Sequence, residues 1–193
     1  MAGRPLDPRV RETILSVTLE QLEERGYQGA SIEGIARAAQ VGKPTIYRRW
    51  ADKTLLVYEA VFGAGAPTAA PDTGSLESDL RAFLRTAVEQ LERPVAAEAI
   101  AGLVGAFKAN PAMHQRVFEA WLEPVGRTFD SIIDAARGRG EVSAEVSPRV
   151  VLDSVVGMVF FRALMVRRAV DRESQEALLQ MILAGISTKG GGR

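Results

Sequence analysis

Apolar residues recur at helical spacing along almost the whole chain, and the alternation typical of half-buried strands is nearly absent. The first helix is predicted to begin after Asp7, a cap residue followed by proline, and to stop at Gly26. A second helix, capped by Ser31, is predicted from Ile32 to Ala39, although Gly34 stands where a capping box would place Glu. The pattern therefore predicts an all-α fold of about nine helices.

Residues 41–44 are predicted to turn the chain into a short third helix over residues 45–50, and the Gly/Pro/Ala stretch at 63–71 is the clearest linker. Pro124 is expected either to kink or to divide the helix that contains it. The other helices are predicted over residues 53–62, 76–91, 95–109, 113–137, 148–168 and 172–186. The chain is thus divided into an N-terminal domain (1–62), a linker (63–75), a C-terminal domain (76–187) and a disordered tail (188–193).

The predicted helix from Val150 to Val166 is apolar around most of its circumference. Such a helix needs cover on most sides, and in a domain this small we expect part of the cover to come from a second copy of the chain. Burial within the chain is the alternative. The residues predicted to lie in a dimer interface are Val155, Val159 and Arg162 on this helix and Leu178 and Ile182 on the helix predicted over residues 172–186.

Composition narrows the classes of function. The 193 residues include 24 basic and 24 acidic side chains, one histidine and no cysteine. These numbers exclude disulfides and thiol nucleophiles, and they leave His114 as the sole imidazole, which we expect to be exposed. No run approaches the ~18 apolar residues of a membrane helix. We therefore expect a cytoplasmic protein that is not an enzyme, with no cofactor, no metal and no membrane partner.

Positive charge is concentrated in one short segment. Residues 37–53 carry five basic side chains and one acid, a local charge of +4 in a neutral protein. The two short helices around this segment have the layout of a helix-turn-helix, whose second helix enters the major groove of DNA. Hydroxyl, lysine and arginine side chains in this segment can contact phosphates and base edges. The alternative is that the charged residues form an ordinary solvent-exposed face of a helical domain. The residues predicted to project toward DNA are Lys43, Pro44, Thr45, Tyr47 and Arg48.

Ile46 and Trp50 are four residues apart, so both are expected to face the core of the N-terminal domain. For Arg49 the sequence leaves two roles open, a phosphate contact and an ion pair with Asp52.

Two stretches, GYQGASIEGIA at 26–36 and VGKPTIYRRWADKTLL at 41–56, resemble the DNA-binding domain of the TetR/AcrR family of bacterial transcriptional regulators. Trp50 stands where the family more often has Phe. The resemblance implies a three-helix DNA-binding domain with a helix-turn-helix. It also implies that Ser31 caps the second helix and touches phosphate, that Lys53 binds phosphate, and that Arg4 reaches a minor groove.

The C-terminal part is similar to ligand-receiving, dimerising helical domains of the same family, through residues 138–142 and the apolar helix with Phe160, Phe161 and Arg162. An effector pocket would be mostly apolar, and core packing is the alternative for any aromatic side chain. The candidate pocket residues are Phe83, Phe107, Met113, Trp121 and Phe129.

The leading hypothesis is a homodimeric, ligand-responsive transcriptional regulator, expected to be a repressor that a small-molecule effector releases from a pseudo-palindromic double-stranded DNA operator. Two other hypotheses remain open: a small-molecule-binding or enzymatic helical domain with a vestigial DNA-binding motif, and a DNA-binding protein without an effector. The absence of a nucleophile–base pair and of metal-ligand spacing argues against an enzyme.

Overall fold

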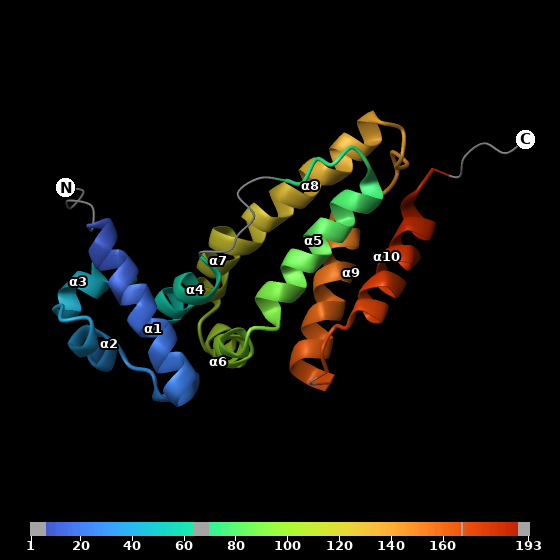
Figure 1. The fold of residues 1–193 in the computed structure, drawn as a ribbon. Helices are drawn as coiled ribbons and strands as arrows, with labels where there is room; N and C mark the ends of the chain where they lie inside the picture. Colours follow the sequence, from blue (N-terminus) through green and yellow to red (C-terminus); the bar gives the residue numbers. More distant parts are fainter. Residues whose placement is uncertain (1–6, 64–69, 167, 189–193) are drawn as a thin grey trace, which may run out of the picture. The chain divides into compact units, whose positions relative to one another are not determined.

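The computed structural model describes residues 7–63, 70–166 and 168–188, and these ranges are almost entirely helical (Figure 1). Within them, β-type pairing is limited to one antiparallel bridge between Val142 and Ser187, so the predicted all-α fold is confirmed. Two π-helical turns, η1 (Phe118–Leu122) and η2 (Phe161–Val166), interrupt the helices. The α-helices are α1 (Pro8–Gly29), α2 (Ile32–Ala38), α3 (Lys43–Tyr47), α4 (Lys53–Phe62), α5 (Leu76–Leu91), α6 (Pro94–Ala109), α7 (Pro111–Val117), α8 (Glu123–Gly138), α9 (Pro148–Phe160) and α10 (Arg172–Ile186).

Contacts divide the chain into two compact units. The first joins Met1–Gly65 with Arg93–Trp121, and the second joins Ala66–Glu92 with Leu122–Arg193. Helices α6 and α7 therefore pack with the N-terminal helices, whereas the sequence pattern assigned them to a C-terminal domain over 76–187. Packing and sequence pattern thus divide the chain differently, and the predicted domain boundaries stay a prediction.

The two residues that predicted the ends of α1, Asp7 and Gly26, have the expected roles in the structure. The Asp7 carboxylate accepts a hydrogen bond from the Arg9 N–H at 2.9 Å and caps the helix. Gly26, the predicted stop, has φ 66° and ψ 178°, a conformation that is essentially restricted to glycine. One more turn follows, in which the Ala30 N–H donates to the Gly26 carbonyl at 3.1 Å.

The start of α2 explains an anomaly of the sequence. Ser31 Oγ accepts a hydrogen bond from the Gly34 N–H at 3.0 Å, which confirms the predicted cap. A Cβ at residue 34 would lie 2.9 Å from Gln21 Oε1 of α1. A side chain at residue 34 would have to displace the end of the buried Gln21 side chain, so glycine fits this position where a capping box would place glutamate.

The turn between α2 and α3 is tight. Gln40 has φ 54°, and the Val41 N–H donates to the Ala36 carbonyl at 2.9 Å, which is the six-to-one bond of a Schellman motif. Helix α3 begins at Lys43, two residues before the predicted start, because Pro44 fits the first turn of a helix, where its missing N–H removes no bond.

The first unit has a core between α1, α2, α3 and α4. Ile14, Ile35, Ile46 and Leu56 are fully buried, and Trp50 is 2% exposed, as predicted for Ile46 and Trp50. Because these side chains come from four helices, the short α3 is held by tertiary packing rather than by its own length.

Helix α6 packs on α1 and α4, and one contact there is very close. A Cβ built on Gly102 would lie 2.1 Å from Cγ of Tyr27, so the tyrosine ring lies directly on the α6 backbone. The Tyr27 hydroxyl also shares a buried 3.2 Å hydrogen bond with the Thr54 hydroxyl of α4. Tyr27 thus joins α1, α4 and α6.

In the second unit, α5 contacts α8, α9 and α10. Both ends of α5 are those predicted from the sequence. The segment that contains Pro124 is divided rather than kinked, because α7, η1 and α8 follow one another and the proline occupies the first turn of α8. Of the helices among the described residues, none is long and apolar enough to cross a membrane.

A buried carboxylate ties the start of α5 to the end of α8. Asp79 is fully buried and accepts hydrogen bonds from the N–H and the hydroxyl of Thr73, each at 2.7 Å. Arg139 donates to Asp79 at 3.2 Å and to Glu141 at 2.6 Å, and Glu141 accepts from the Leu76 N–H. The 138–142 motif of the sequence is therefore a structural clamp.

Candidate DNA-binding surface

Helix α3 presents most of the predicted DNA-contacting residues on one exposed side. Lys43, Pro44 and Arg48 are exposed, and Tyr47 is 51% exposed, although it is a large aromatic side chain. Thr45 is half-buried, so less of it is open to a partner. Arg4 lies outside the described residues. The arrangement offers a cation, a guanidinium and a phenol on one short helix, groups that suit phosphate oxygens and base edges.

Lys53 has an intrachain role that the sequence did not indicate. Its Nζ donates to the carbonyls of Tyr27 at 2.8 Å and of Ala30 at 3.1 Å, and it lies 4.2 Å from the centre of the Tyr27 ring. Burial lowers the pKa of this ammonium group. With two N–H groups committed to the end of α1, the predicted phosphate contact of Lys53 stays a prediction.

Glu59 of α4 is a central residue that the sequence analysis missed. Its carboxylate accepts hydrogen bonds from Arg11 at 2.7 Å, from Arg49 at 3.0 Å and from the Trp50 indole at 2.7 Å. Burial alone would raise the pKa of Glu59, but the bonds from Arg49, Arg11 and Trp50 outweigh it and hold the pKa below its ordinary value. Glu59 thus fixes the end of the α3 segment against α1 and α4.

The Glu59 contacts bear on one of the two roles that the sequence left open for Arg49, the ion pair with Asp52, while its phosphate contact stays a prediction. In the free chain Arg49 pairs with Glu59 and stacks 5.5 Å from the centre of the Trp50 ring. Asp52, the predicted partner, instead caps α4 by accepting from the Thr54 and Leu55 N–H groups at 2.7 and 3.1 Å. No periodicity or motif signalled Glu59, because its partners lie nine to 48 residues away.

Lys43 has an acidic partner on the same surface. Its Nζ lies 2.7 Å from Oε1 of Glu33, in the first turn of α2. The hydrogen bond and the charge of Lys43 lower the pKa of Glu33, and those of Glu33 raise the pKa of Lys43. Both groups are therefore charged at neutral pH.

The residues predicted to line an effector pocket belong to both compact units. Phe83 and Phe129 are buried in the second unit, edge to face with their ring centres 5.0 Å apart. Phe107 belongs to the first unit, with its ring 5.3 Å from the exposed His114. The side chains of Met113 and Trp121 lie outside the described part of the structure. Core packing accounts for Phe83 and Phe129, and the pocket stays a prediction.

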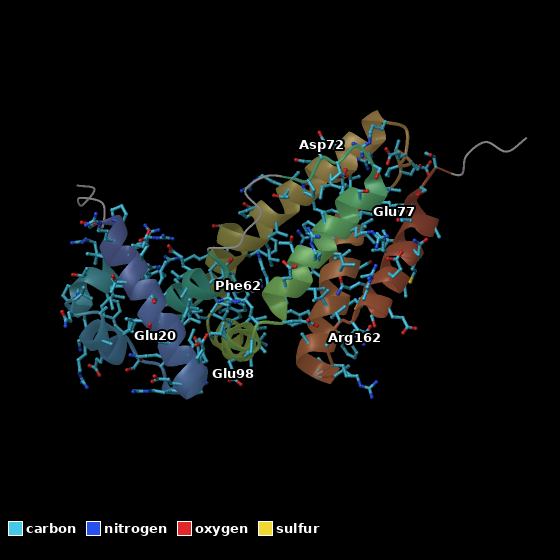
Figure 2. All side chains as sticks on the ribbon, in the orientation of Figure 1. Glu20, Phe62, Asp72, Glu77, Glu98 and Arg162 are labelled. Carbon is cyan, nitrogen blue, oxygen red and sulfur yellow. The ribbon has the colours of Figure 1, made fainter. Side chains whose placement is uncertain are left out.

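The predicted dimer residues need a correction. Val155, Val159, Leu178 and Ile182 are all less than a tenth exposed, so they fill the chain's own core instead of facing a partner. The half-buried Arg162 (labelled in Figure 2) donates to the Ala169 carbonyl at 3.2 Å. Periodicity alone does not tell which side of an over-apolar helix its own chain covers, so the sequence could not show that these four residues are buried; the position of the interface stays a prediction. The exposed apolar residues of α9, η2 and α10 are Val150, Phe161, Met165, Val166 and Met181.

Comparisons with known proteins agree with this geometry. Residues 14–60 match the family of bacterial regulatory proteins of the tetR type, and residues 70–182 match the tetracycline repressor-like C-terminal domain. The uncharacterized HTH-type transcriptional regulator Rv1556 of Mycobacterium tuberculosis is 30% identical over 197 residues, covering 100% of this chain and 96% of the relative.

A DNA-binding transcriptional repressor TetR of Mycobacteroides abscessus is 29% identical over 77% of this chain and 79% of its own length. The crystal structure of the TetR family regulator SCO0332 superposes with a TM-score of 0.75 at 27% identity, covering 92% of this chain and 98% of the other.

Fold, surface and relatives define a helix-turn-helix transcriptional regulator. The chain belongs to the TetR family of bacterial regulators. Proteins of this family typically bind DNA operators, dimerise and respond to small-molecule effectors, commonly as repressors. They are not typically enzymes.

Proposed function

We propose that this chain is a cytoplasmic, ligand-responsive repressor that binds a pseudo-palindromic operator as a homodimer and has no catalytic activity. The observation that carries the proposal is the exposed side of α3, where Lys43 and Tyr47 project from a five-residue helix and Arg48 projects from its C-cap. On the opposite side, Ile46 and Trp50 are buried in the core, and the Trp50 indole donates to Glu59 of α4. Two such helices spaced about 34–36 Å apart would enter successive major grooves.

The proposed dimer interface is the exposed apolar stripe of α9 and η2 together with Met181 of α10. Phe161 is 57% exposed and Met165 is 73% exposed, and Val150 lies three turns earlier on the same face. Several exposed large apolar side chains on one face are typical of interaction sites. A second copy would cover it with the same surface, as a two-fold axis requires.

The proposed route from effector to DNA runs through α6 and α4. Helix α6 contacts α1 and α4, and Arg93 at its start donates to the Val61 carbonyl of α4 at 3.2 Å. An effector that prefers a displaced α6 would shift α4 and the helices packed on it. By linkage, the effector would then weaken DNA binding by the factor by which DNA weakens effector binding.

The test is a mobility shift of the purified protein on its own upstream intergenic DNA, against a scrambled duplex, at two salt concentrations. Retention at the higher salt, with a footprint over two half-sites, supports the proposal. If both duplexes bind equally weakly and release together as salt rises, the upstream DNA is not the operator. A genome-wide selection that then enriches no sequence would contradict sequence-specific regulation.

A further inference from the structure

The ion pair between Glu33 and Lys43 differs from the other contacts of basic residues in this region. Arg49 pairs with Glu59, whose side chain is only 20% exposed, and Lys53 donates to backbone carbonyls. Arg49 is itself 43% exposed but is bonded to a carboxylate that is mostly buried, and Lys53 is half-buried. Lys43 and Glu33 have side chains that are 50% and 68% exposed, so both members of this pair lie on the surface proposed to meet DNA.

The pair changes what Lys43 can contribute to DNA binding. A lysine that meets a phosphate strengthens binding of any sequence, because it releases a condensed counterion. A lysine whose charge is balanced by a carboxylate 2.7 Å away contributes much less net attraction. Glu33 therefore acts most strongly on the sequence-independent part of the affinity.

We propose that Glu33 limits non-specific DNA binding by this regulator, because it holds Lys43 in an ion pair that lowers affinity for non-operator DNA. This inference rests on the proposed function, since it assumes that α3 meets DNA. An exposed ion pair is weak and opens easily. At the operator, base contacts by the neighbouring side chains add binding energy that random DNA does not offer, so a fixed cost leaves the operator bound while random sites are released.

The experiment measures the affinity of the full chain for a fluorescent duplex of scrambled sequence over a series of salt concentrations. Removal of the acid by Glu33→Gln is expected to tighten this binding about two- to fivefold, the range typical of an exposed ion pair. The slope of log affinity against log salt is expected to steepen by up to about 0.9, the contribution of one freed phosphate contact. Unchanged or weaker binding of scrambled DNA by Glu33→Gln would overturn the inference.

Two controls separate the ion pair from a general effect of charge. Glu20→Gln removes the same charge from an exposed site on α1 (labelled in Figure 2) and is expected to leave the slope unchanged. In a chain that already carries Lys43→Ala, Glu33→Gln is expected to have no further effect on the slope. A steeper slope in either control would show that Glu33 acts through overall charge, which contradicts the inference.

The outcomes also separate this inference from the proposed function. If the unmodified chain binds duplex DNA and Glu33→Gln leaves that binding unaltered, the inference about Glu33 fails and the proposed function stands. If the unmodified chain retains no duplex of any sequence even at low salt, both fail. Both residues are exposed, so circular dichroism is expected to show an unchanged fold in all variants.

Discussion

The ring of Tyr27 lies directly on the backbone of Gly102, so closely that a Cβ at residue 102 would be 2.1 Å from the Tyr27 Cγ atom. This contact joins the end of α1 to the middle of α6. Because Tyr27 also bonds to Thr54 and accepts a hydrogen bond at its carbonyl from Lys53, a displacement of the ring is expected to reach α4.

Gly102→Ala is expected to destabilise the protein by about 1–3 kcal/mol, because the new methyl group must push the Tyr27 ring away. The measurement is urea unfolding followed by circular dichroism. The matched control is Gly105→Ala on the same helix, where a Cβ meets nothing within 4 Å. That change is expected to stabilise α6 by up to about 1 kcal/mol. Equal effects of the two substitutions would contradict the described contact.

Glu59→Gln is expected to destabilise the protein by about 1–3 kcal/mol at pH 7, because two guanidinium groups lose a charged acceptor. The pKa of Glu59 is lowered in the folded state, so its stabilisation is complete above its ordinary pKa of 4.5 and is lost as pH falls through the folded value. The difference between Glu59→Gln and the unmodified chain should therefore shrink below about pH 4.5. Glu20→Gln is the control and is expected to change stability by less than ~0.5 kcal/mol.

Two aspartates that contact Arg139 are expected to contribute very differently to the stability of the fold. Asp79 is fully buried, so Asp79→Ala removes the acceptor of three hydrogen bonds, two from Thr73 and one from Arg139, and is expected to cost about 3–5 kcal/mol. Asp72 (labelled in Figure 2) is 77% exposed and 3.5 Å from the same guanidinium, and Asp72→Ala is expected to cost less than ~0.5 kcal/mol. Thermal unfolding measures both, and a similar loss in the two variants would contradict the proposed role of the clamp.

Phe161→Glu is expected to convert the proposed dimer to a monomer without unfolding it, because this exposed ring would lie in the interface. Light scattering coupled to size exclusion gives the mass, and circular dichroism reports the fold. The control, Asp130→Lys, changes an exposed position on α8 and is expected to stay dimeric. If Phe161→Glu stays a dimer, the interface lies on another face of the chain.

Local signals in the sequence predicted much of the fold. Asp7, Ser31 and the bounds of α5 follow from cap residues and periodicity, which act over a few residues. The exposed side of α3 was predicted for the same reason. Glu59 and the contact between Tyr27 and Gly102 were not predictable, because they depend on partners brought together only by tertiary packing. For the same reason the sequence could not tell which face of α9 the chain itself covers, since the buried Val155 and Val159 and the exposed Phe161 are all apolar.

The central claim is that the exposed side of α3 reads operator DNA, and fluorescence anisotropy of Tyr47→Ala and Arg48→Ala on the footprinted operator tests it most directly. Each variant is expected to lose about 1–3 kcal/mol of operator binding, roughly five- to 150-fold, with its circular dichroism spectrum and melting curve unchanged. Val104→Ala, at an exposed apolar site on α6, is the control and should bind normally. Operator affinity retained in both Tyr47→Ala and Arg48→Ala would contradict the assignment of α3 as the recognition helix.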